Sequence, residues 1–200
     1  MKRTTTIRLG ITGGIGSGKS YVSDILTRRF GIPVYNCDVE AKRLNIQSDE
    51  IRQALTQLVG PDVYAPDGTL RKSVLAAYLF ASADHARQVN AIVHPIVARD
   101  FQAWAQAQQD SGTPIVAMES AILFESGFDH LVDHTLCVTA PRELCLQRAM
   151  QRDGATRQAI EQRMAQQMDD EERRNKAHHT ILNDGSEIDN QINEILKKIK

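Results

Sequence analysis

Residues Gly13 to Ser20 spell GGIGSGKS and match the pattern G-x-x-x-x-G-K-[ST] at every position. An apolar run with Ile7, Leu9 and Ile11 precedes this stretch. The segment that follows has apolar residues at 22, 25, 26 and 30, a spacing typical of a helix. A strand, a glycine-rich loop and a helix in this order form the context in which the pattern binds phosphate. We therefore predict a phosphate-binding loop at 13–20, rather than a glycine-rich turn without a ligand.

Each residue type in this loop has a chemical role. Its four glycines allow positive φ angles and let backbone N–H groups turn toward an anion. Lys19 supplies a positive charge for the β- and γ-phosphates, and the Ser20 hydroxyl is a ligand for Mg²⁺. The residues expected to bind the nucleotide here are Gly14, Ile15, Gly16, Ser17, Gly18, Lys19, Ser20 and Tyr21.

Composition limits the class of protein. The 200 residues, of which 42% are hydrophobic, suit one globular domain with room for an inserted lobe. A net charge of −1 without a basic tail argues against a nucleic-acid partner. No membrane partner is expected, because no apolar run is as long as a membrane span and the opening MKRTTTIRLGIT lacks a signal-peptide core. Cys37, Cys137 and Cys145 form no C-x-x-C pair, which favours reduced thiols and a cytoplasmic location.

Apolar runs at 6–12, 33–36, 115–119, 134–138 and 179–182 alternate with helical patterns, which predicts an α/β fold with a parallel five-stranded sheet. Between Ala41 and Asp110 only helical patterns occur, broken at 60–68 and at His94-Pro95. We predict a nucleotide-binding core of residues 1–40, 111–140 and 177–200, a helical substrate-binding insertion of residues 41–110, and an arginine-bearing helical lid of residues 141–176. Within the lid, Gly154 before Thr156 predicts a joint between two helices.

The acceptor of the phosphate follows partly by elimination. A switch-type GTPase needs D-x-x-G and N-K-x-D motifs. The sequence has no D-x-x-G, and His178 stands where the second motif needs its Asp. No LSGGQ-like run supports a transporter ATPase. These absences favour phosphate transfer to a small molecule.

Asp38 is the candidate base. It follows the predicted strand that ends in VYN, where a carboxylate can accept a proton from an attacking hydroxyl or orient it. The alternative is that Asp38 caps a helix beginning at Val39.

Arg148 and Arg152 are four residues apart and share one helix face, as suits charge building on a phosphoryl group. The alternative for this pair is a solvated helix face. Glu119 ends an apolar run and is a candidate contact to Mg²⁺ through water. The histidines do not show a spacing that favours a zinc site.

Six short motifs occur in order along the chain. They are TGGIGSGKS from Thr12 to Ser20, Asn36-Cys37-Asp38, His94-Pro95, Leu123-Phe124-Glu125, Gln147-Arg148 with Arg152-Asp153, and Asn183-Asp184-Gly185. In these motifs the sequence resembles the dephospho-CoA kinase family over nearly its whole length. Together the six are far more specific than the phosphate-binding loop alone.

The resemblance implies ATP-dependent phosphorylation of the ribose 3′-hydroxyl of dephospho-CoA, with ATP and Mg²⁺ bound in a three-layer P-loop nucleotide kinase core. It implies that Asp38 is the base, that Lys19 with Arg148 or Arg152 holds the phosphates, and that Ser20 holds Mg²⁺. Asn183 is implied at the adenine site. The implied contacts to dephospho-CoA are Asp38, Lys72, His94, Leu123 and Glu125.

The chain departs from the family pattern at five positions. Asn36 replaces an acid, Tyr21 replaces a small or β-branched residue, Ala121 replaces Pro, Lys72 stands beside Arg71 where Arg is usual, and His178 replaces Asp. Two other functions remain open at this point. One is another small-metabolite or nucleoside kinase, and the other is a regulatory protein that hydrolyses ATP slowly. The sequence does not determine the oligomeric state.

Overall fold

The computed structural model of the chain describes residues 5–185 and 187–199. Residues 1–4, Ser186 and Lys200 fall in the predicted core segments and lie outside the described residues. The chain divides into two compact units. The core unit is Met1–Asn36 with Trp104–Lys200, and the helical unit is Cys37–Ala103.

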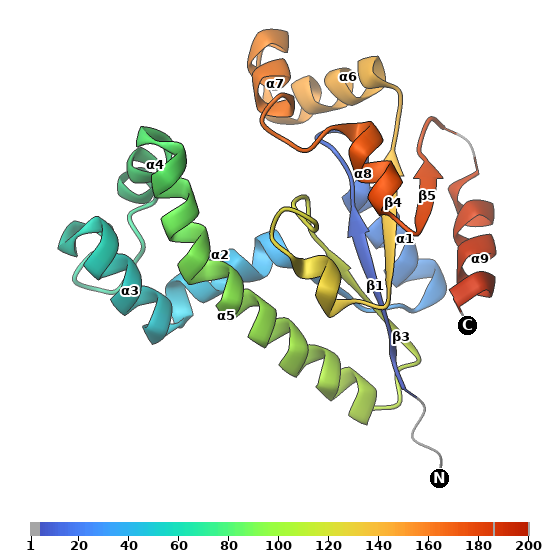
Figure 1. Cartoon of the computed structure of the whole chain (residues 1–200), viewed down its shortest axis with the longest axis horizontal. Helices are drawn as coiled ribbons and strands as arrows, with labels where there is room; N and C mark the ends of the chain where they lie inside the picture. The colour runs from blue at the N-terminus through green and yellow to red at the C-terminus, as the bar shows by residue number, and fades with distance from the viewer. Residues whose placement is uncertain (1–4, 186, 200) are drawn as a thin grey trace. The chain divides into compact units, whose positions relative to one another are not determined.

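Five parallel strands among the described residues form one sheet of the core unit, in the order β2-β3-β1-β4-β5 (Figure 1). The strands are β1 (Ile7–Thr12), β2 (Val34–Asn36), β3 (Ile115–Glu119), β4 (His134–Thr139) and β5 (His179–Leu182). The predicted parallel sheet is confirmed. Every residue of β3 is buried, as expected for a strand of a parallel sheet that is covered on both faces.

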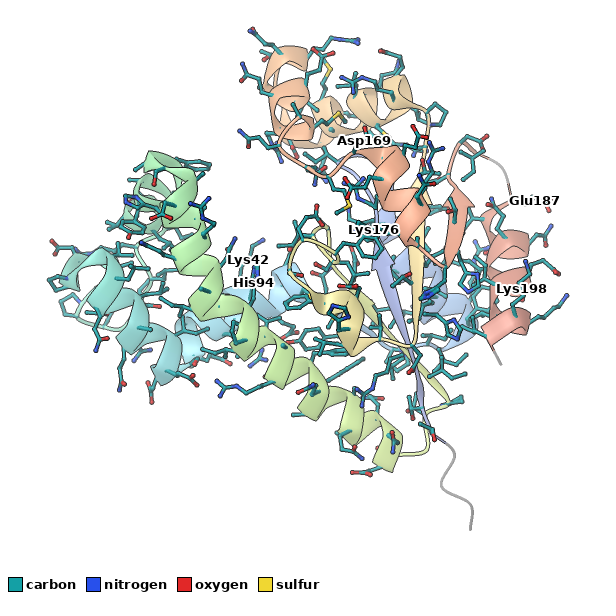
Figure 2. The ribbon with its side chains drawn as sticks, viewed as in Figure 1. Lys42, His94, Asp169, Lys176, Glu187 and Lys198 are labelled. Atoms are coloured by element: carbon teal, nitrogen blue, oxygen red, sulfur yellow. The ribbon has the colours of Figure 1, made fainter. Side chains whose placement is uncertain are left out.

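Helices α1 and α9 pack on one face of this sheet. The helices of the core unit are α1 (Lys19–Phe30), α6 (Arg142–Asp153), α7 (Arg157–Met164), α8 (Asp170–Lys176) and α9 (Ile188–Ile199), with the 3-10 turn η2 (Phe128–Leu131). Leu9 and Ile11 of β1 share a buried cluster with Leu26 of α1 and Ile192 of α9. Asp169 and Lys176 mark the two ends of α8 in Figure 2.

The carboxyl ends of the central strands meet at one edge of the sheet. Glu119, the last residue of β3, pairs in register with Ile11 of β1 and with Asn36, the last residue of β2. Thr12, the last residue of β1, pairs with Cys137 of β4. The loop that follows Thr12 therefore starts beside Glu119, at the edge where parallel sheets bind their ligands.

The helical unit contains no strand among its described residues. Its elements are α2 (Cys37–Gln47), α3 (Asp49–Val59), η1 (Pro61–Val63), α4 (Lys72–Ala81) and the first part of α5 (Ala83–Asp110). Ser48 caps α3 by accepting a hydrogen bond from Ile51 N (3.3 Å). Arg43 of α2 donates to Asp100 of α5 (2.6 Å), which ties two helices of the unit together. The helical unit begins and ends a few residues before the predicted insertion of residues 41–110.

The predicted break at His94-Pro95 is wrong. Helix α5 runs without interruption from Ala83 to Asp110 with Pro95 inside it. A proline removes one backbone hydrogen bond and strains the turn before it, which weakens a helix but does not always end one. Here Val93 and Val97, on either side of Pro95, are both buried, so packing holds the helix together across the proline.

The predicted joint in the lid is confirmed. Gly154 ends α6 in the left-handed conformation (φ 61°), and its N–H bonds to Met150 O (2.9 Å). Thr156 then caps α7 by accepting from Ala159 N (3.3 Å). The two helices are thus separate elements joined at Gly154.

Candidate active site

Two glycines let neighbouring segments approach the phosphate-binding loop closely. Gly16 (φ 75°) and Gly18 (φ 93°) both have left-handed backbone conformations. A Cβ atom on Gly16 would lie 2.1 Å from the Cys145 carbonyl oxygen, and one on Gly18 would lie 2.0 Å from Asn183 Nδ2. A side chain at Gly16 would therefore displace the backbone of α6, and one at Gly18 would displace the Asn183 side chain.

The loop has the features of an anion site. Lys19 Nζ donates to the carbonyl oxygens of Gly13 (2.7 Å) and Gly14 (3.1 Å), so its positive charge lies at the first half of the loop. The hydroxyls of Thr12 and Ser17 are buried, and neither has a hydrogen-bond partner within residues 5–185 and 187–199. Polar groups left in this way at a glycine-rich loop fit a phosphate ligand.

Ser20, Glu119 and Asn36 lie together at the carboxyl edge of the sheet. Ser20 Oγ donates to Glu119 Oε1 (2.7 Å), and Asn36 Nδ2 donates to Glu119 Oε2 (3.1 Å). Glu119 itself is only 6% exposed. A hydroxyl beside one carboxylate is a donor set that fits Mg²⁺, which takes few protein ligands and keeps several waters.

The structure brings both predicted arginines to the loop. Arg148 and Arg152 line a cavity of about 240 Å³ together with Gly18, Lys19 and Ser20. Arg148 donates to Asn183 O (3.0 Å), whereas Arg152 makes two hydrogen bonds to its neighbour Asp153 (2.7 and 3.1 Å). These bonds, with one from Arg163, hold the pKa of Asp153 well below its usual range. The alternative of a purely solvated face does not describe Arg148, which is half-buried against the loop.

Asn183 fixes the second half of the loop. It is 3% exposed and donates through Nδ2 to Ser17 O (2.8 Å), while its own N–H bonds to Thr139 O (2.7 Å). Beside it lies a cavity of about 520 Å³ whose apolar lining includes Ile25, Ile188 and the ring of Tyr21. The lining also includes the polar or charged residues Arg29, Arg148 and Asn183, and such a mixture of apolar and polar groups suits a nucleotide base.

Asp38 belongs to the helical unit, where it lies in the first turn of α2. The helix begins at Cys37, so Asp38 is inside it and does not cap a helix beginning at Val39. Lys72 is the first residue of α4 and is exposed. His94 is half-buried in α5, and burial lowers its pKa.

The two remaining predicted contacts to the substrate are in the core unit. Leu123 is fully buried and packs toward Gly10 of β1. Glu125 is exposed, and its Oε1 accepts a hydrogen bond from Met168 N (3.4 Å). Whether either side chain touches a substrate stays a prediction.

Sequence reasoning missed Gln167 and Arg173. Gln167 Oε1 accepts a hydrogen bond from Ile15 N in the loop (2.9 Å). Arg173 is 0% exposed, although it lies in the run DDEERR, which resembles a solvated helix face. No motif marks either residue, because both depend on how α8 packs near the loop.

Two other kinds of chemistry receive no support. Burial raises the pKa of the Cys137 thiol to about 11 and raises that of Cys145 as well, so neither is an activated nucleophile. In the described part of the chain no group of three or more His, Cys, Asp or Glu side chains could hold a metal ion.

No described helix has both the length and the apolar character to cross a membrane.

Comparisons with known proteins identify the family of this chain. The family model described as dephospho-CoA kinase matches residues 7–189. A dephospho-CoA kinase of Bacteroides fragilis is 49% identical over 179 residues, which cover 90% of this chain and 85% of the relative. A crystal structure from Thermus thermophilus superposes with a TM-score of 0.83 at 32% identity, covering 98% of each chain. The Campylobacter jejuni dephospho-CoA kinase gives a TM-score of 0.67 at 23% identity, covering 96% of each chain, and supports the fold.

Proposed function

The chain belongs to the dephospho-CoA kinase family, and we propose from this premise which of its residues perform each part of the reaction. It transfers a phosphoryl group from ATP to the ribose 3′-hydroxyl of dephospho-CoA and forms CoA and ADP, the last step of CoA biosynthesis. The match of the family model across residues 7–189 carries this conclusion, because it spans the loop, Asp38 and Asn183.

Lys19, Arg148 and Arg152 stabilise the phosphoryl group in transit. Their support is the shared cavity of about 240 Å³, which the three cationic residues line together with Gly16 and Gly18 of the glycine-rich loop. Charge spreads over the equatorial oxygens during transfer, so fixed cations at this point lower the barrier. To contact a phosphate oxygen, Arg152 must give up part of its hydrogen bonding to Asp153.

Ser20 and Glu119 would hold Mg²⁺, Ser20 through its hydroxyl and Glu119 through water. The 2.7 Å hydrogen bond between them supports this assignment. When bound there, Mg²⁺ neutralises charge on the β- and γ-phosphates. Asn36 donates to the other carboxylate oxygen and so orients Glu119.

Asp38 accepts the proton of the 3′-hydroxyl or orients it for attack. The position of Asp38 two residues beyond β2, whose last residue Asn36 bonds to Glu119, supports this role. We assign the contacts to the rest of dephospho-CoA to Lys72, His94, Leu123 and Glu125. The adenine of ATP lies in the cavity beside Asn183 and Tyr21, whose volume of about 520 Å³ is ample for a base.

The reaction is placed in the cytoplasm. The three cysteines are buried and form no disulfide among the described residues, which agrees with a reducing compartment.

A coupled ADP-release assay tests this function. We expect ADP release with ATP, Mg²⁺ and dephospho-CoA, little release without the acceptor, and poor replacement of the acceptor by adenosine or AMP. Lys19→Ala should lower transfer at least about 100-fold, since one lost charge contact at a transition state commonly costs that much. Lys197→Ala, an exposed lysine of α9, is the matched control.

Equal rates with and without dephospho-CoA would contradict the kinase assignment. Efficient phosphorylation of adenosine would instead favour a nucleoside kinase. Transfer at nearly the wild-type rate in Lys19→Ala would contradict the role of the loop.

A further inference from the structure

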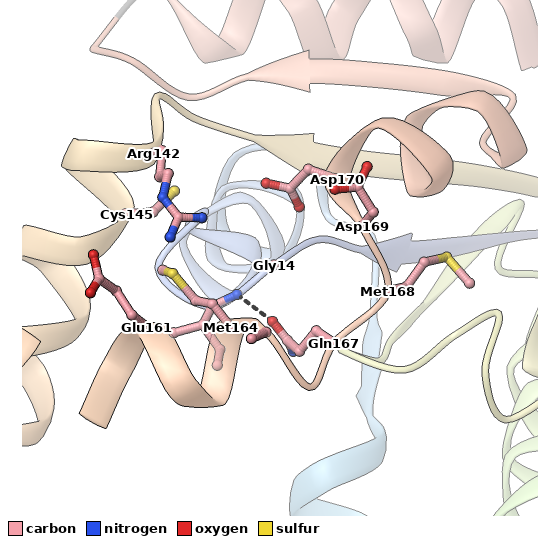
Figure 3. A pocket seen from close by; sticks show the side chains of 11 residues that line it. Gly14, Arg142, Cys145, Glu161, Met164, Gln167, Met168, Asp169 and Asp170 are labelled. Atoms are coloured by element: carbon pink, nitrogen blue, oxygen red, sulfur yellow. Dashed lines mark hydrogen bonds between the residues drawn. The ribbon is translucent and has the colours of Figure 1, made fainter. Parts of the chain in front are cut away.

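The end of the lid holds the phosphate-binding loop at Ile15. Figure 3 shows the hydrogen bond from the loop to Gln167, whose Oε1 accepts from Ile15 N at 2.9 Å. The side chain of Ile15 packs against a buried cluster of lid residues, Leu146, Ala149 and Ile160. One loop residue is therefore held by both its backbone and its side chain.

Gln167 is itself fixed by the next residue. The N–H of Met168 donates to Glu125 Oε1 (3.4 Å), and the Met168 carbonyl oxygen accepts from Arg173 (2.6 Å). Asp169 then caps α8 by accepting from Glu171 N (2.8 Å). The turn before α8 is thus tied on both sides, which limits where the Gln167 side chain can reach.

Arg173 of α8 holds this turn through its hydrogen bond to the Met168 carbonyl oxygen. Its side chain is completely buried, pairs with Asp170, and has an Nε that finds no partner among residues 5–185 and 187–199. Its NH1 lies 3.5 Å from where a Cβ on Gly14 would be. Burying a guanidinium without a full set of hydrogen bonds costs free energy. The buried position of Arg173 beside the loop therefore indicates a structural role and not a solvated surface charge.

Ile15 directly follows the two loop residues that hold the Lys19 ammonium. The ammonium of Lys19, which serves the β- and γ-phosphates, bonds to the carbonyl oxygens of Gly13 and Gly14, directly before Ile15. We propose that Gln167 is a positioning residue that sets the Gly14–Ile15 peptide for the γ-phosphate, and that buried Arg173 holds Gln167 in place. The inference rests on the kinase function proposed above.

Nucleotide binding without the acceptor tests this proposal. Titration calorimetry with Mg-ATP and Mg-ADP gives a ratio of dissociation constants for each variant. Gln167→Ala should weaken ATP binding about 3- to 10-fold, the value of one neutral hydrogen bond, and ADP binding less than about 2-fold. Gln167→Glu should weaken ATP further relative to ADP, because it brings a negative charge to the γ-phosphate end. Gln166→Ala, an exposed neighbour, is the matched control.

Arg173 is tested through the same ratio. Arg173→Met should reproduce the selective loss of ATP affinity, and Arg173→Lys should restore part of it, whereas exposed Arg174→Met should not change it. If Arg173→Met does not fold, the Gln167 variants decide the question. A wild-type ATP:ADP ratio in folded Gln167→Ala would overturn the proposal, even if transfer to dephospho-CoA is normal. Failure of the wild type to transfer phosphate would count against the proposed function instead.

Discussion

At the scale of single residues, Asn36 shows how a departure from the family pattern is accommodated. An acid at this position would place a second carboxylate against Glu119, and like charges at that distance repel strongly. Asn36 donates a hydrogen bond to Glu119 (3.1 Å) and leaves one carboxylate beside Ser20. Asn36 therefore adds no charge to the proposed Mg²⁺ site, and its hydrogen bond orients Glu119.

Asp38→Asn separates a chemical role from a structural one. We expect kcat to fall about 10²- to 10⁴-fold, the range for a lost general base, with little change in the dissociation constant of ATP. Part of the loss would reflect orientation of the hydroxyl, since the transition state can be loose. Steady-state kinetics measure kcat, and calorimetry measures ATP binding.

Asp49→Asn is the control for this variant. Asp49 also lies in the first turn of a helix of the same unit, so it carries the same helix-terminus effect without the proposed chemistry. Equal and small effects of the two substitutions would show that Asp38 only stabilises the start of α2.

At the scale of elements, the segment 141–176, which we predict to act as a lid, has a joint and an anchored end. Gly154 separates α6 from α7, while the turn before α8 is tied to the loop, to Glu125 and to buried Arg173. Arg157 bridges α6 and α7 through bonds to Glu143 (2.6 and 2.9 Å) on exposed surface. Such exposed ion pairs add little stability, so the segment around the joint is the part best able to move.

Hydrogen exchange should locate this motion. Adding Mg-ATP and dephospho-CoA together should slow amide exchange in the lid, most around 154–166 and least in α8. Replacing Arg148 and Arg152 together with Ala should remove most of this protection. It should also lower kcat more than it raises the KM for dephospho-CoA, because the lost contacts are to the phosphoryl group.

The amides of α9 give the internal reference for this experiment, since its apolar face is buried against the sheet. Identical exchange of the lid with and without ligands would show that residues 141–176 are a static part of the core.

At the scale of the whole molecule, we expect histidines to make the free energy of unfolding depend on pH between 5.5 and 7.5. The ring centroids of His134 in β4, of His179 in β5 and of His178 directly before β5 are 5.7 to 6.5 Å apart. His178 Nδ1 accepts a hydrogen bond from Thr135 N (3.0 Å), at the position where an Asp is usual in the family pattern. Burial lowers the pKa of His179, and nearby His134, His178 and Lys198 lower it further.

The free energy of unfolding should therefore fall as the pH drops from 7.5 to 5.5. The unfolded chain binds a proton at His179 near the usual pKa of about 6.5, whereas the folded chain resists it, so acid favours unfolding. The stabilising contribution is complete above that value and is lost below it, as the pH falls toward the lowered pKa of the folded state. His94, whose pKa is lowered by burial, adds to the same dependence.

Urea unfolding at the two pH values measures this effect. His179→Gln should reduce the difference between them, and His130→Gln, whose side chain is 86% exposed, should leave it unchanged. A wild-type difference in His179→Gln would show that other groups carry the pH dependence.

The sequence by itself determined the features that depend on neighbours along the chain. The phosphate-binding loop, the five strands and the joint at Gly154 follow from residue spacing, because backbone conformation and hydrophobic period are local properties. The local rule failed at Pro95, where buried neighbours hold a helix that the proline alone weakens.

Only the tertiary structure decided which distant residues meet. Asn183 reaches Ser17, Glu119 reaches Ser20, and Gln167 reaches Ile15 across 166, 99 and 152 positions of the chain. Arg173 is an extreme case, since its charged surroundings in the sequence predict exposure, whereas packing of α8 against β4 buries it completely. Burial and hydrogen bonding depend on what the fold places nearby, and no spacing along the chain encodes that.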